Sequence, residues 1–546
     1  MHKEASETGA NSSGVRKEAS ETGANSSGVR KEASERLNLN NPRQTESSLG
    51  VCKSYPSQRL AETRSQICAV CGYSYNFFSL FRLVIRKYSV LLQKNNRHYY
   101  NGHYHFVVMK FYDRESEQQL LRDVLDQSKR EARMTVIMGR RRIGKTELSQ
   151  RCGDETILYF FVGKKAEPLL CQDFTTEITN KLGVPVLGQA NSFSDVFRFV
   201  LQLSENRPFT LVIDEFQNFQ KVNQAVFSDM QRDWDLWKRK SHLNLIISGS
   251  VFTLMKKIFE DYEEPLFGRA DEKMNLQPFR TGVLKEILGD FNPDYTPEDL
   301  LALFSITGGV AWYVTLLLDR GKTCKNKMLS ALTEENSPFI NEGRNILVEE
   351  FGTDYVIYFS ILTCIASGMK TSAEIKSELG IDNISSYLSR LEDYYGLISK
   401  YQPIFAKESS KKVRYQLDDC FLIFWFRFFF KYQALVENKA LKALGDIIQR
   451  DYDGLSGLMM ERYFVRKFRE KGRYIVGKWW DRKGFNEIDL VVVDPVAKEA
   501  WVYELKKDEN RYDEASFRVK VDTMVAQTPE LRKMTIHMGS LSMNDM

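Results

Sequence analysis

The sequence has few cysteines for its length and no long uninterrupted hydrophobic run. Its 546 residues include eight widely spaced cysteines, a pattern that excludes a disulfide-stabilised secreted scaffold. The longest apolar runs, 77–92 and 421–430, are broken by arginine or lysine, and both are shorter than the roughly 20 residues of a membrane-spanning helix. Residues 1–4 lack the apolar core of a signal peptide. We therefore expect a protein of the reducing cytoplasm that does not enter a membrane.

The sequence also lacks a large excess of charge of one sign. The 77 Lys and Arg residues against 72 Asp and Glu residues leave a net charge of +5. Overall charge therefore does not predict a nucleic-acid-binding protein, although local basic faces remain open. Hydrophobic residues make up 43% and charged residues 27% of the chain, which is ordinary for globular domains that bury a core. At about 150 residues per domain, the length predicts three or four domains.

The N-terminal region differs in character from the rest of the chain. The 14 residues Lys3–Arg16 recur without change at Lys17–Arg30. The repeat is polar and has too few apolar side chains to offset the entropy of ordering, so 1–108 is predicted to be a disordered or non-native extension. A well-patterned amphipathic sequence starts at Met109, and our hypothesis is that Met109 is the physiological start. Mass spectrometry of the native N-terminus tests this, and abundant peptides from 37–108 would contradict it.

A zinc site is an alternative role for this extension. It contains the pair Cys68 and Cys71, followed by His98 and His103, and these residue types hold structural zinc. A single CxxC pair without a second matched pair is weak evidence for a metal site. The sequence therefore favours an extension without a metal.

From residue 131 onward, short β-branched runs alternate with helical patterns. Strands are expected at 134–138, 156–162, 209–213 and 243–248, and helices at 166–182, 194–205 and 223–240. Such alternation is typical of a parallel sheet with helices on both faces. The sequence thus predicts an α/β fold for this part of the chain.

A phosphate-binding motif follows the first of these strands. The segment Gly139–Thr146, GRRRIGKT, fits GxxxxGK[ST] and opens a helix expected at 145–152. Backbone N–H groups of such a loop face the phosphates. The ammonium group of Lys145 reaches the β- and γ-phosphates, and the hydroxyl of Thr146 binds Mg²⁺. The motif predicts ATP and Mg²⁺ as cofactors.

Two carboxylates follow a second strand, about 70 residues after the loop. Asp214 and Glu215 end the apolar run 211–213. In this position Asp214 can hold magnesium, while Glu215 can polarise the attacking water as a base. An Asp-Glu pair that only caps a strand is the alternative, but the upstream loop makes it weaker. The predicted nucleotide-binding residues are Gly139, Arg140, Arg141, Arg142, Ile143, Gly144, Lys145, Thr146, Asp214 and Ser250.

Two further residues have open roles. Ser248 ends the strand 243–248 and Ser250 follows it. At this strand end a serine can sense the γ-phosphate, and either serine can instead be the N-cap of the next helix. Arg269 stands in a turn, where it can stabilise developing phosphate charge in cis or from a neighbouring copy in a homo-oligomer. A solvated surface arginine is the alternative.

Six motifs now stand in a recognisable order: 111–115 (FYDRE), 139–146 (GRRRIGKT), 211–219 (LVIDEFQNF), 246–250 (IISGS), 265–269 (PLFGR) and 307–309 (TGG). In this order they resemble the prokaryotic AAA-type ATPases often called archaeal ATPases, within the signal-transduction group of P-loop ATPases. The resemblance covers about 109–345. It implies a P-loop core with an additional strand, followed by a helical lid. One departure is Ala311, where the family usually has proline, and this change removes no catalytic group.

A winged helix is expected after the lid. A first helix is expected to start with a cap at 371–375 and to end at Gly380, and a second helix is expected at 384–391. Strands at 395–398 and 413–417 follow, with a basic tip at 407–412 between them. Side chains of the second helix can meet a major groove, and lysines of the tip can meet phosphates. The second helix has only one arginine, Arg390, so a protein-contact module is the alternative.

The C-terminal region adds a second group of charged residues. In the strand expected at 500–506, Glu504 and Lys506 are two positions apart and so lie on one face. Pairing with the strand at 487–493 can bring Asp489 near them, so that Asp489 and Glu504 hold a divalent metal while Lys506 activates water. Glu461 on the preceding helix can complete the set. A charged β-hairpin is the alternative.

This arrangement resembles the PD-(D/E)xK nuclease core. Residues 419–546 also resemble the C-terminal domain of unknown function that is fused to these ATPases. The expected fold class is α/β: a P-loop NTPase with a parallel sheet and helical lid, then a winged helix and a PD-(D/E)xK-like domain. The expected domains are an extension (1–108), an ATPase core (109–285), a lid (286–345), a winged helix (346–418), a helical connector (419–450) and a nuclease-like domain (451–546).

The sequence therefore predicts a Mg²⁺-dependent ATPase coupled to binding or cleavage of double-stranded DNA. The alternative is a regulatory ATP-driven switch whose C-terminal domains bind a protein partner without nuclease activity. The predicted catalytic residues are Lys145, Glu215, Arg269, Asp489, Glu504 and Lys506, and the predicted metal ligands are Thr146, Asp214, Asp489 and Glu504.

Overall fold

The computed structural model describes residues 110–546, apart from 186–187, 189, 352–354 and 408–409. The repeat, the zinc alternative and the start at Met109 lie outside the described residues. Among the described helices, none combines the length and the hydropathy that crossing a membrane requires.

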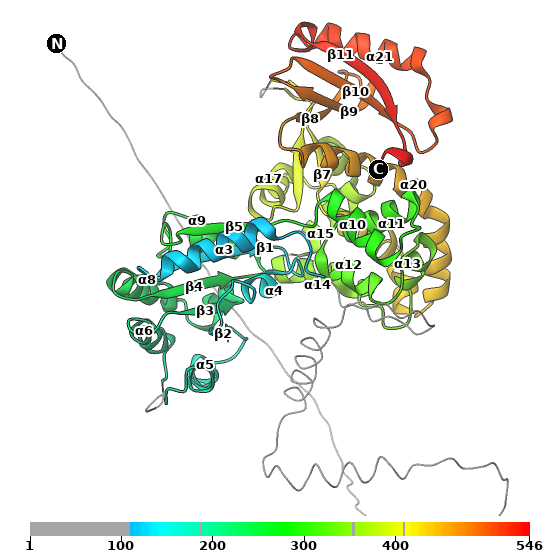
Figure 1. Cartoon of the computed structure of the whole chain (residues 1–546). Helices are drawn as coiled ribbons and strands as arrows, with labels where there is room; N and C mark the ends of the chain where they lie inside the picture. The colour runs from blue at the N-terminus through cyan, green and yellow to red at the C-terminus, as the bar shows by residue number, and fades with distance from the viewer. Residues whose placement is uncertain (1–109, 186–187, 189, 352–354, 408–409) are drawn as a thin grey trace, which may run out of the picture. The chain divides into compact units, whose positions relative to one another are not determined.

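A five-stranded parallel sheet forms the first half of the described chain (Figure 1). Its strands are β1 (Arg133–Gly139), β2 (Ile157–Phe161), β3 (Phe209–Asp214), β4 (Leu243–Ser248) and β5 (Glu272–Leu276). They follow the order β2-β3-β4-β1-β5, and every neighbouring pair is parallel. Four strands lie where the sequence predicts them, and the parallel α/β sheet is confirmed. The carboxyl ends of all five strands therefore meet at one edge, where polar residues can converge.

The fifth strand was not predicted from the sequence. β5 reads EKMNL, and only Met274 and Leu276 are buried. Because β5 is an edge strand that pairs only with β1, its remaining side chains stay largely in contact with solvent. A short strand with two apolar residues carries too weak a pattern to be recognised from the sequence.

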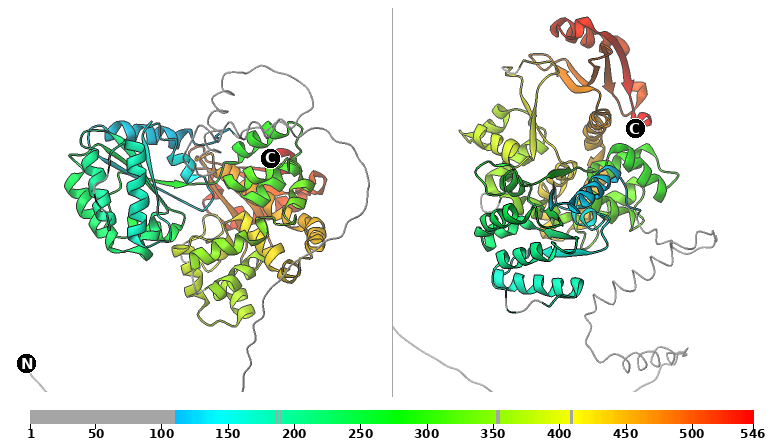
Figure 2. Two further views of the ribbon diagram at one scale, coloured as in Figure 1. Left: turned by 90° about the horizontal axis from the view of Figure 1, so that it is seen from below. Right: turned by 60° about the vertical axis from the view of Figure 1, so that its left-hand side comes forward.

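Helices cover both faces of this sheet (Figure 2). Leu121 of α3 and Leu148 of α4 pack in the same apolar core as Ile137 and Val212 of the sheet. Helices α5, α6, α8 and α9 pack against the alternate sheet residues, such as Val136. This division follows from the two-residue period of strands. The bounds are α3 (Glu115–Ser128), α4 (Lys145–Ser149), α5 (Glu167–Leu182), α6 (Phe193–Leu203), η1 (Phe216–Asn218), α7 (Phe219–Val222), α8 (Ala225–Trp237) and α9 (Phe252–Glu260). Helix α4 is therefore shorter than the predicted 145–152.

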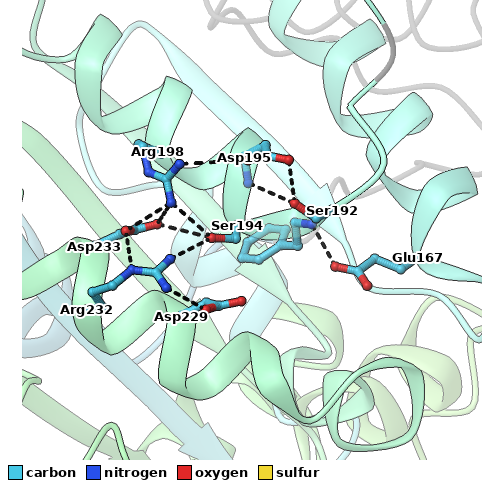
Figure 3. Close-up of polar contacts among 9 residues, drawn as sticks. Glu167, Ser192, Ser194, Asp195, Arg198, Asp229, Arg232 and Asp233 are labelled. Atoms are coloured by element: carbon cyan, nitrogen blue, oxygen red, sulfur yellow. Dashed lines mark hydrogen bonds and ion pairs between the residues drawn. The ribbon is translucent and has the colours of Figure 1, made fainter.

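A buried carboxylate joins α6 to α8 (Figure 3). Asp233 is only 1% exposed, and its oxygens accept hydrogen bonds from Arg198 at 3.2 Å and from Arg232 at 3.1 Å. The hydroxyl of Ser194 donates a further bond at 3.2 Å. The two guanidinium groups compensate the desolvation of the buried charge, so the network fixes the relative placement of the two helices.

Five helices follow the sheet: α10 (Thr281–Phe291), α11 (Pro297–Thr307), α12 (Ala311–Leu318), α13 (Lys325–Ala331) and α14 (Phe339–Phe351). They begin before and end after the range 286–345 that the sequence assigns to a helical lid, and the lid assignment stays a prediction. Thr296 caps α11 in a capping box, and Gly308 ends that helix with φ of 56°, a conformation that favours glycine. Helix α12 begins at Ala311 itself. The missing proline therefore does not prevent the start of this helix.

The next segment contains helices followed by a small antiparallel sheet. Its elements are α15 (Tyr355–Ala366), α16 (Ser372–Leu379), α17 (Ile384–Ser389), the π-helical turn η2 (Arg390–Tyr394), β6 (Ile398–Tyr401) and β7 (Arg414–Leu417). Helix α16 has Thr371 as its N-cap and Gly380 as its C-cap, as predicted. The first strand was wrongly placed at 395–398, because the π-helical turn holds the chain in a helical path up to Tyr394. The winged-helix assignment stays a prediction.

A long helix leads into the C-terminal sheet. The elements are α18 (Cys420–Trp425), η3 (Phe426–Phe430), α19 (Gln433–Glu437), α20 (Leu441–Arg469), β8 (Ile475–Trp480), β9 (Glu487–Asp494), β10 (Glu499–Leu505), η4 (Glu509–Arg511), α21 (Glu514–Gln527), η5 (Leu531–Lys533), β11 (Thr535–Leu541) and η6 (Met543–Asp545). The sheet order is β11-β10-β9-β8, in which only β10 and β11 are parallel. Helix α20 runs through residue 450, so the boundary expected there lies inside one helix.

Candidate functional site

The loop between β1 and α4 is sharply curled. Gly139, Arg142 and Gly144 have φ values of 151°, 68° and 101°. A Cβ atom on Gly139 would lie 2.9 Å from the carbonyl oxygen of Leu276, so β5 approaches too closely for any larger residue. The backbone N–H groups at the start of a helix have no intrahelical acceptors. The loop therefore has the shape and the free donors that a phosphate group requires.

Lys145 lies across this loop. Its Nζ atom donates to the carbonyl oxygens of Gly139 and Arg140, each at 2.9 Å. Burial lowers the pKa of Lys145 to about 8, and the carboxylates of Glu215 and Asp214 partly oppose that shift. The ammonium group is therefore held within the loop, at the place where the sequence predicts phosphate binding.

Asp214, at the end of β3, accepts four hydrogen bonds. Its Oδ2 atom accepts from the hydroxyls of Thr146 and Tyr159, each at 2.7 Å. Its Oδ1 atom accepts from the hydroxyl of Ser248 at 2.6 Å and from the backbone N–H of Glu215 at 3.0 Å. Asp214 is 4% exposed. The structure thus brings together the predicted magnesium-binding pair and adds Ser248 and Tyr159, of which the sequence analysis missed Tyr159.

Glu215 has a strained backbone and a restrained side chain. Its φ of 56° is uncommon for residues other than glycine. The Oε2 atom accepts hydrogen bonds from Gln217 Nε2 at 2.6 Å and from Ser250 Oγ at 2.7 Å. Ser250 therefore contacts the predicted base, and neither it nor Ser248 caps α9, whose N-cap position is Val251. The N-cap alternative is wrong for both serines.

The first two loop arginines bind carboxylates from later parts of the chain. Arg140 pairs with Asp419, and Arg141 pairs with Glu349 of α14. Asp419 is buried, whereas the Arg141 pair is partly exposed. These carboxylates were not identified from the sequence. They are separated from the loop arginines by 279 and 208 positions, and only the tertiary fold brings them together.

The third loop arginine is held more firmly. Arg142 Nη2 donates to Glu342 Oε2 at 2.9 Å, and Nε donates to the other oxygen of the same carboxylate. Its guanidinium carbon lies 3.6 Å from the ring centre of Trp312, a cation–π contact. The backbone N–H of Trp312 also donates to the carbonyl of Arg142 at 3.2 Å. The loop is thereby fastened to α12 and α14.

Arg269 lies near the amino end of β1, whereas the phosphate loop follows the carboxyl end of that strand. It donates to the carbonyl of Phe267 at 2.8 Å and to Asp235 at 3.2 Å. Two residues later, the N–H of Asp271 donates to the carbonyl of Met134 at the start of β1. The phosphate loop follows the other end of β1, roughly 20 Å away at 3.3 Å per residue. Arg269 is therefore outside the Asp214–Glu215 cluster of its own chain.

The C-terminal charged residues also come together. Asp489 on β9 accepts a hydrogen bond from the backbone N–H of Leu505 at 3.0 Å. Glu504 Oε1 accepts from Lys506 Nζ at 3.0 Å and from Lys520 Nζ at 3.1 Å. Strand pairing places β9 and β10 side by side in antiparallel register, which explains this proximity. Lys520, on α21, was not identified from the sequence.

Burial raises the pKa of Asp489 to about 6; the carboxylates of Glu461 and Glu504 add to the rise, and Lys478 opposes it. Glu461 itself pairs with Lys478. No group of three or more Asp, Glu, His or Cys residues suited to a metal ion occurs in the described part of the chain. The predicted ligands Asp489 and Glu504 therefore form a two-carboxylate arrangement with lysines around it.

A cavity of about 1480 Å³ is lined by two arginines of the phosphate loop, by Ser250 and by C-terminal charged residues, but not by Lys145, Thr146, Asp214 or Glu215. The lining residues from these parts of the chain include Arg140, Arg141, Ser250, Asp489, Glu504 and Lys506. Its volume exceeds the 300–1,000 Å³ of ordinary small-molecule pockets. The phosphate loop and the C-terminal carboxylates thus face one continuous space.

Comparison with known families agrees with this geometry. Residues 111–317 match a family described as an ATPase domain predominantly from Archaea, and residues 425–517 match a family of archaeal and bacterial proteins of unknown function. The chain therefore contains an archaeal-type P-loop ATPase domain followed by a second, C-terminal family domain. An uncharacterized protein of Methanocaldococcus jannaschii is 28% identical over 408 residues, which cover 72% of this chain and 87% of that protein.

The chain is also similar to several solved structures. A Walker-type ATPase of Pyrococcus abyssi is 17% identical, with a TM-score of 0.45, over 58% of this chain and 96% of that one. The Aeropyrum pernix ORC2 protein is 15% identical, with a TM-score of 0.40, over 60% and 95%. A signal transduction ATPase with a tetratricopeptide repeat sensor from Pyrococcus horikoshii is 17% identical, with a TM-score of 0.31, over 66% and 49%.

Proposed function

We propose that this protein binds ATP and hydrolyses it with Mg²⁺. The observation that carries the proposal is the contact of Thr146 with Asp214, beside Glu215 and at the mouth of the curled loop. Hydroxyl and carboxylate oxygens are ligands that magnesium accepts, usually together with water. Two such oxygens 2.7 Å apart fit one ion between the phosphate loop and β3.

In the proposed mechanism the loop N–H groups hold the phosphates. Lys145 exchanges its two carbonyl acceptors for phosphate oxygens, which its buried ammonium group reaches from within the loop. Thr146 and Asp214 would hold a magnesium ion, which when bound would neutralise charge on the phosphates. Glu215 orients the attacking water and accepts its proton, after release from Ser250 and Gln217.

The test is ATP binding and turnover by the full chain. We expect Lys145→Ala to lose nucleotide binding, and Glu215→Gln to retain binding but to lose turnover by at least about 100-fold, as for removal of a general base. Lys165→Ala serves as the control, because the ion pair of Lys165 with Asp173 is on the surface. Undiminished turnover in the Lys145 and Glu215 variants would falsify the site.

We propose further that ATP turnover is coupled to DNA binding or cleavage by the C-terminal region. Asp489 and Glu504 supply carboxylates for one divalent cation, while Lys506 and Lys520 supply positive charge for a phosphodiester. The cavity shared with the phosphate loop supports the coupling. The segment 355–417 is a second candidate for DNA contact, through the proposed winged helix.

Plasmid nicking with Mg²⁺ or Mn²⁺ tests the cleavage proposal. We expect Asp489→Ala to abolish nicking. Glu499→Ala should retain it, because Glu499 lies on the same strand as Glu504 but is partly exposed and forms a long ion pair with His537, at 3.9 Å. ATP turnover with and without duplex DNA tests the coupling. Nicking that survives in the Asp489 variant excludes these carboxylates as the cleavage site.

The second candidate function is a regulatory switch that binds a protein partner. The contacts of the three loop arginines with Asp419, Glu349 and Glu342 favour it, since they fasten the nucleotide site to later parts of the chain. Arg269 can then act only on the nucleotide of a neighbouring copy in a homo-oligomer. Nucleotide-dependent oligomerisation without DNA cleavage supports this candidate, and light scattering with ATP and ADP measures it.

A further inference from the structure

We propose that Tyr159 is a positioning residue for magnesium, acting through Asp214. The inference rests on the proposed ATPase function and adds a residue that no motif of the sequence identifies. Its basis is the hydrogen bond of 2.7 Å from the Tyr159 hydroxyl to Asp214 Oδ2, the oxygen that also accepts from Thr146.

The four donors around Asp214 use the whole carboxylate. An ionised carboxylate offers about four lone-pair sites. Thr146 and Tyr159 occupy Oδ2, while Ser248 and the N–H of Glu215 occupy Oδ1. With 4% exposure, Asp214 has little contact with solvent that could replace a missing donor. Its orientation is therefore set by these four groups.

A hydroxyl keeps two lone pairs while its O–H donates, so Thr146 could ligate a magnesium ion and still donate to Asp214 Oδ2. Asp214 would then orient the hydroxyl of Thr146 toward the ion. Tyr159 and Ser248 would keep the carboxylate of Asp214 from rotating. Magnesium tolerates little departure from octahedral geometry, so loss of the Tyr159 hydroxyl weakens metal binding more than phosphate binding.

The position of Tyr159 in the sheet explains how it reaches the site. Side chains alternate along β2, and the residues on the face of Tyr159 are less buried than Leu158 and Phe160. β2 pairs with β3 so that Tyr159 lies opposite Val212, two residues before Asp214. The tyrosine ring spans this offset and delivers its hydroxyl to the carboxylate. A phenylalanine would fill the same space without the donor.

The experiment uses the full chain and Tyr159→Phe, with a fluorescent ATP analogue titrated in EDTA and at increasing Mg²⁺. We expect affinity without magnesium to stay within about twofold of wild type, since the phosphate contacts are intact. The Mg²⁺ concentration for half-maximal enhancement of binding should rise about tenfold or more, as for one lost hydrogen bond to a charged group. Turnover should recover at high Mg²⁺.

Tyr452→Phe is the matched control. Tyr452 is a buried tyrosine whose hydroxyl bonds Ser305 at 3.1 Å, so it loses the same group away from the loop and should keep the wild-type Mg²⁺ requirement. Ser248→Ala should shift that requirement in the same direction as Tyr159→Phe. An unchanged Mg²⁺ requirement in Tyr159→Phe, or equal loss of binding with and without Mg²⁺, overturns the inference. Absence of nucleotide binding in the wild-type protein instead refutes the proposed function on which it rests.

Discussion

Glu470, directly after α20, accepts hydrogen bonds from both the backbone N–H and the hydroxyl of Thr281, the first residue of α10, at 2.9 and 2.6 Å. One turn earlier, Arg466 pairs with Glu470 at 2.9 Å and donates to the carbonyls of Gly308 and Phe279. The helix that enters the C-terminal sheet therefore contacts the start of α10 and the end of α11.

Removal of this arginine should destabilise the protein. The guanidinium group of Arg466 donates hydrogen bonds to the carbonyls of Gly308, Phe279 and Pro278. Arg466→Ala removes this donor from all three. We expect a loss of about 2–3 kcal/mol in the free energy of unfolding, measured by urea denaturation. Arg469→Ala, a change three residues away at an exposed site whose hydrogen bond to Val476 is 3.5 Å long, should cost less than about 0.5 kcal/mol. Equal losses of unfolding free energy in the two variants would contradict this stabilising role of Arg466.

Release of Arg141 should strengthen nucleotide binding. The Arg141–Glu349 pair is more than a third exposed on both sides, so it contributes little to stability. Glu349→Gln frees the guanidinium for phosphate, and we expect nucleotide affinity to rise about two- to fivefold at low salt and less at high salt. Fluorescent nucleotide titration measures both. Asp173→Asn, which breaks the surface pair with Lys165, should leave affinity unchanged; if both variants bind alike, the contact does not compete with nucleotide.

Glu350 should make stability depend on pH. Burial raises its pKa from 4.5 to about 7, Arg140 and the hydroxyl of Thr253 oppose the rise, and Glu349 adds to it. Between these values the folded state binds more protons than the unfolded state, so stability falls as pH rises from about 4.5 to 7. We expect Glu350→Gln to be more stable than wild type by about 2–3 kcal/mol at pH 8 and equally stable near pH 4.5.

Urea denaturation of the wild-type protein and the Glu350→Gln variant across this pH range measures the difference. Gln retains an oxygen that can accept from Thr253, so the expected change reflects the charge alone. A difference between the two proteins that does not vary with pH would show that the pKa of Glu350 is the same in the folded and unfolded states.

The network of Figure 3 should be structural and independent of nucleotide binding. Asp233→Asn removes the buried charge that pairs with Arg198 and Arg232, whose side chains are 39% and 50% exposed. Because both arginines can then turn to water, we expect a cost of about 2 kcal/mol rather than the 3–5 of a fully buried pair. Asp229→Asn, at the exposed end of the same network, should cost under about 1 kcal/mol. Nucleotide affinity should remain at the wild-type value in both.

The phosphate site was recognisable from the sequence because its parts are local. Glycines at 139 and 144 and the residues Lys145 and Thr146 follow one another within a single loop, and Asp214 ends an apolar strand. Tyr159 and Glu342 carry no comparable signal. A tyrosine in a strand and a glutamate in a helix are ordinary residues until the fold brings them to the loop.

The sequence by itself therefore determined the alternation of strands and helices, the phosphate loop and the placement of charged residues at strand ends, since these depend on residue order and period over a few positions. The tertiary structure alone decided which carboxylates meet the loop arginines, that Tyr159 and Ser248 share Asp214, and that Arg269 stands at the far edge of the sheet. Such contacts join residues tens to hundreds of positions apart, and strand order and helix packing, which no local pattern encodes, bring them together.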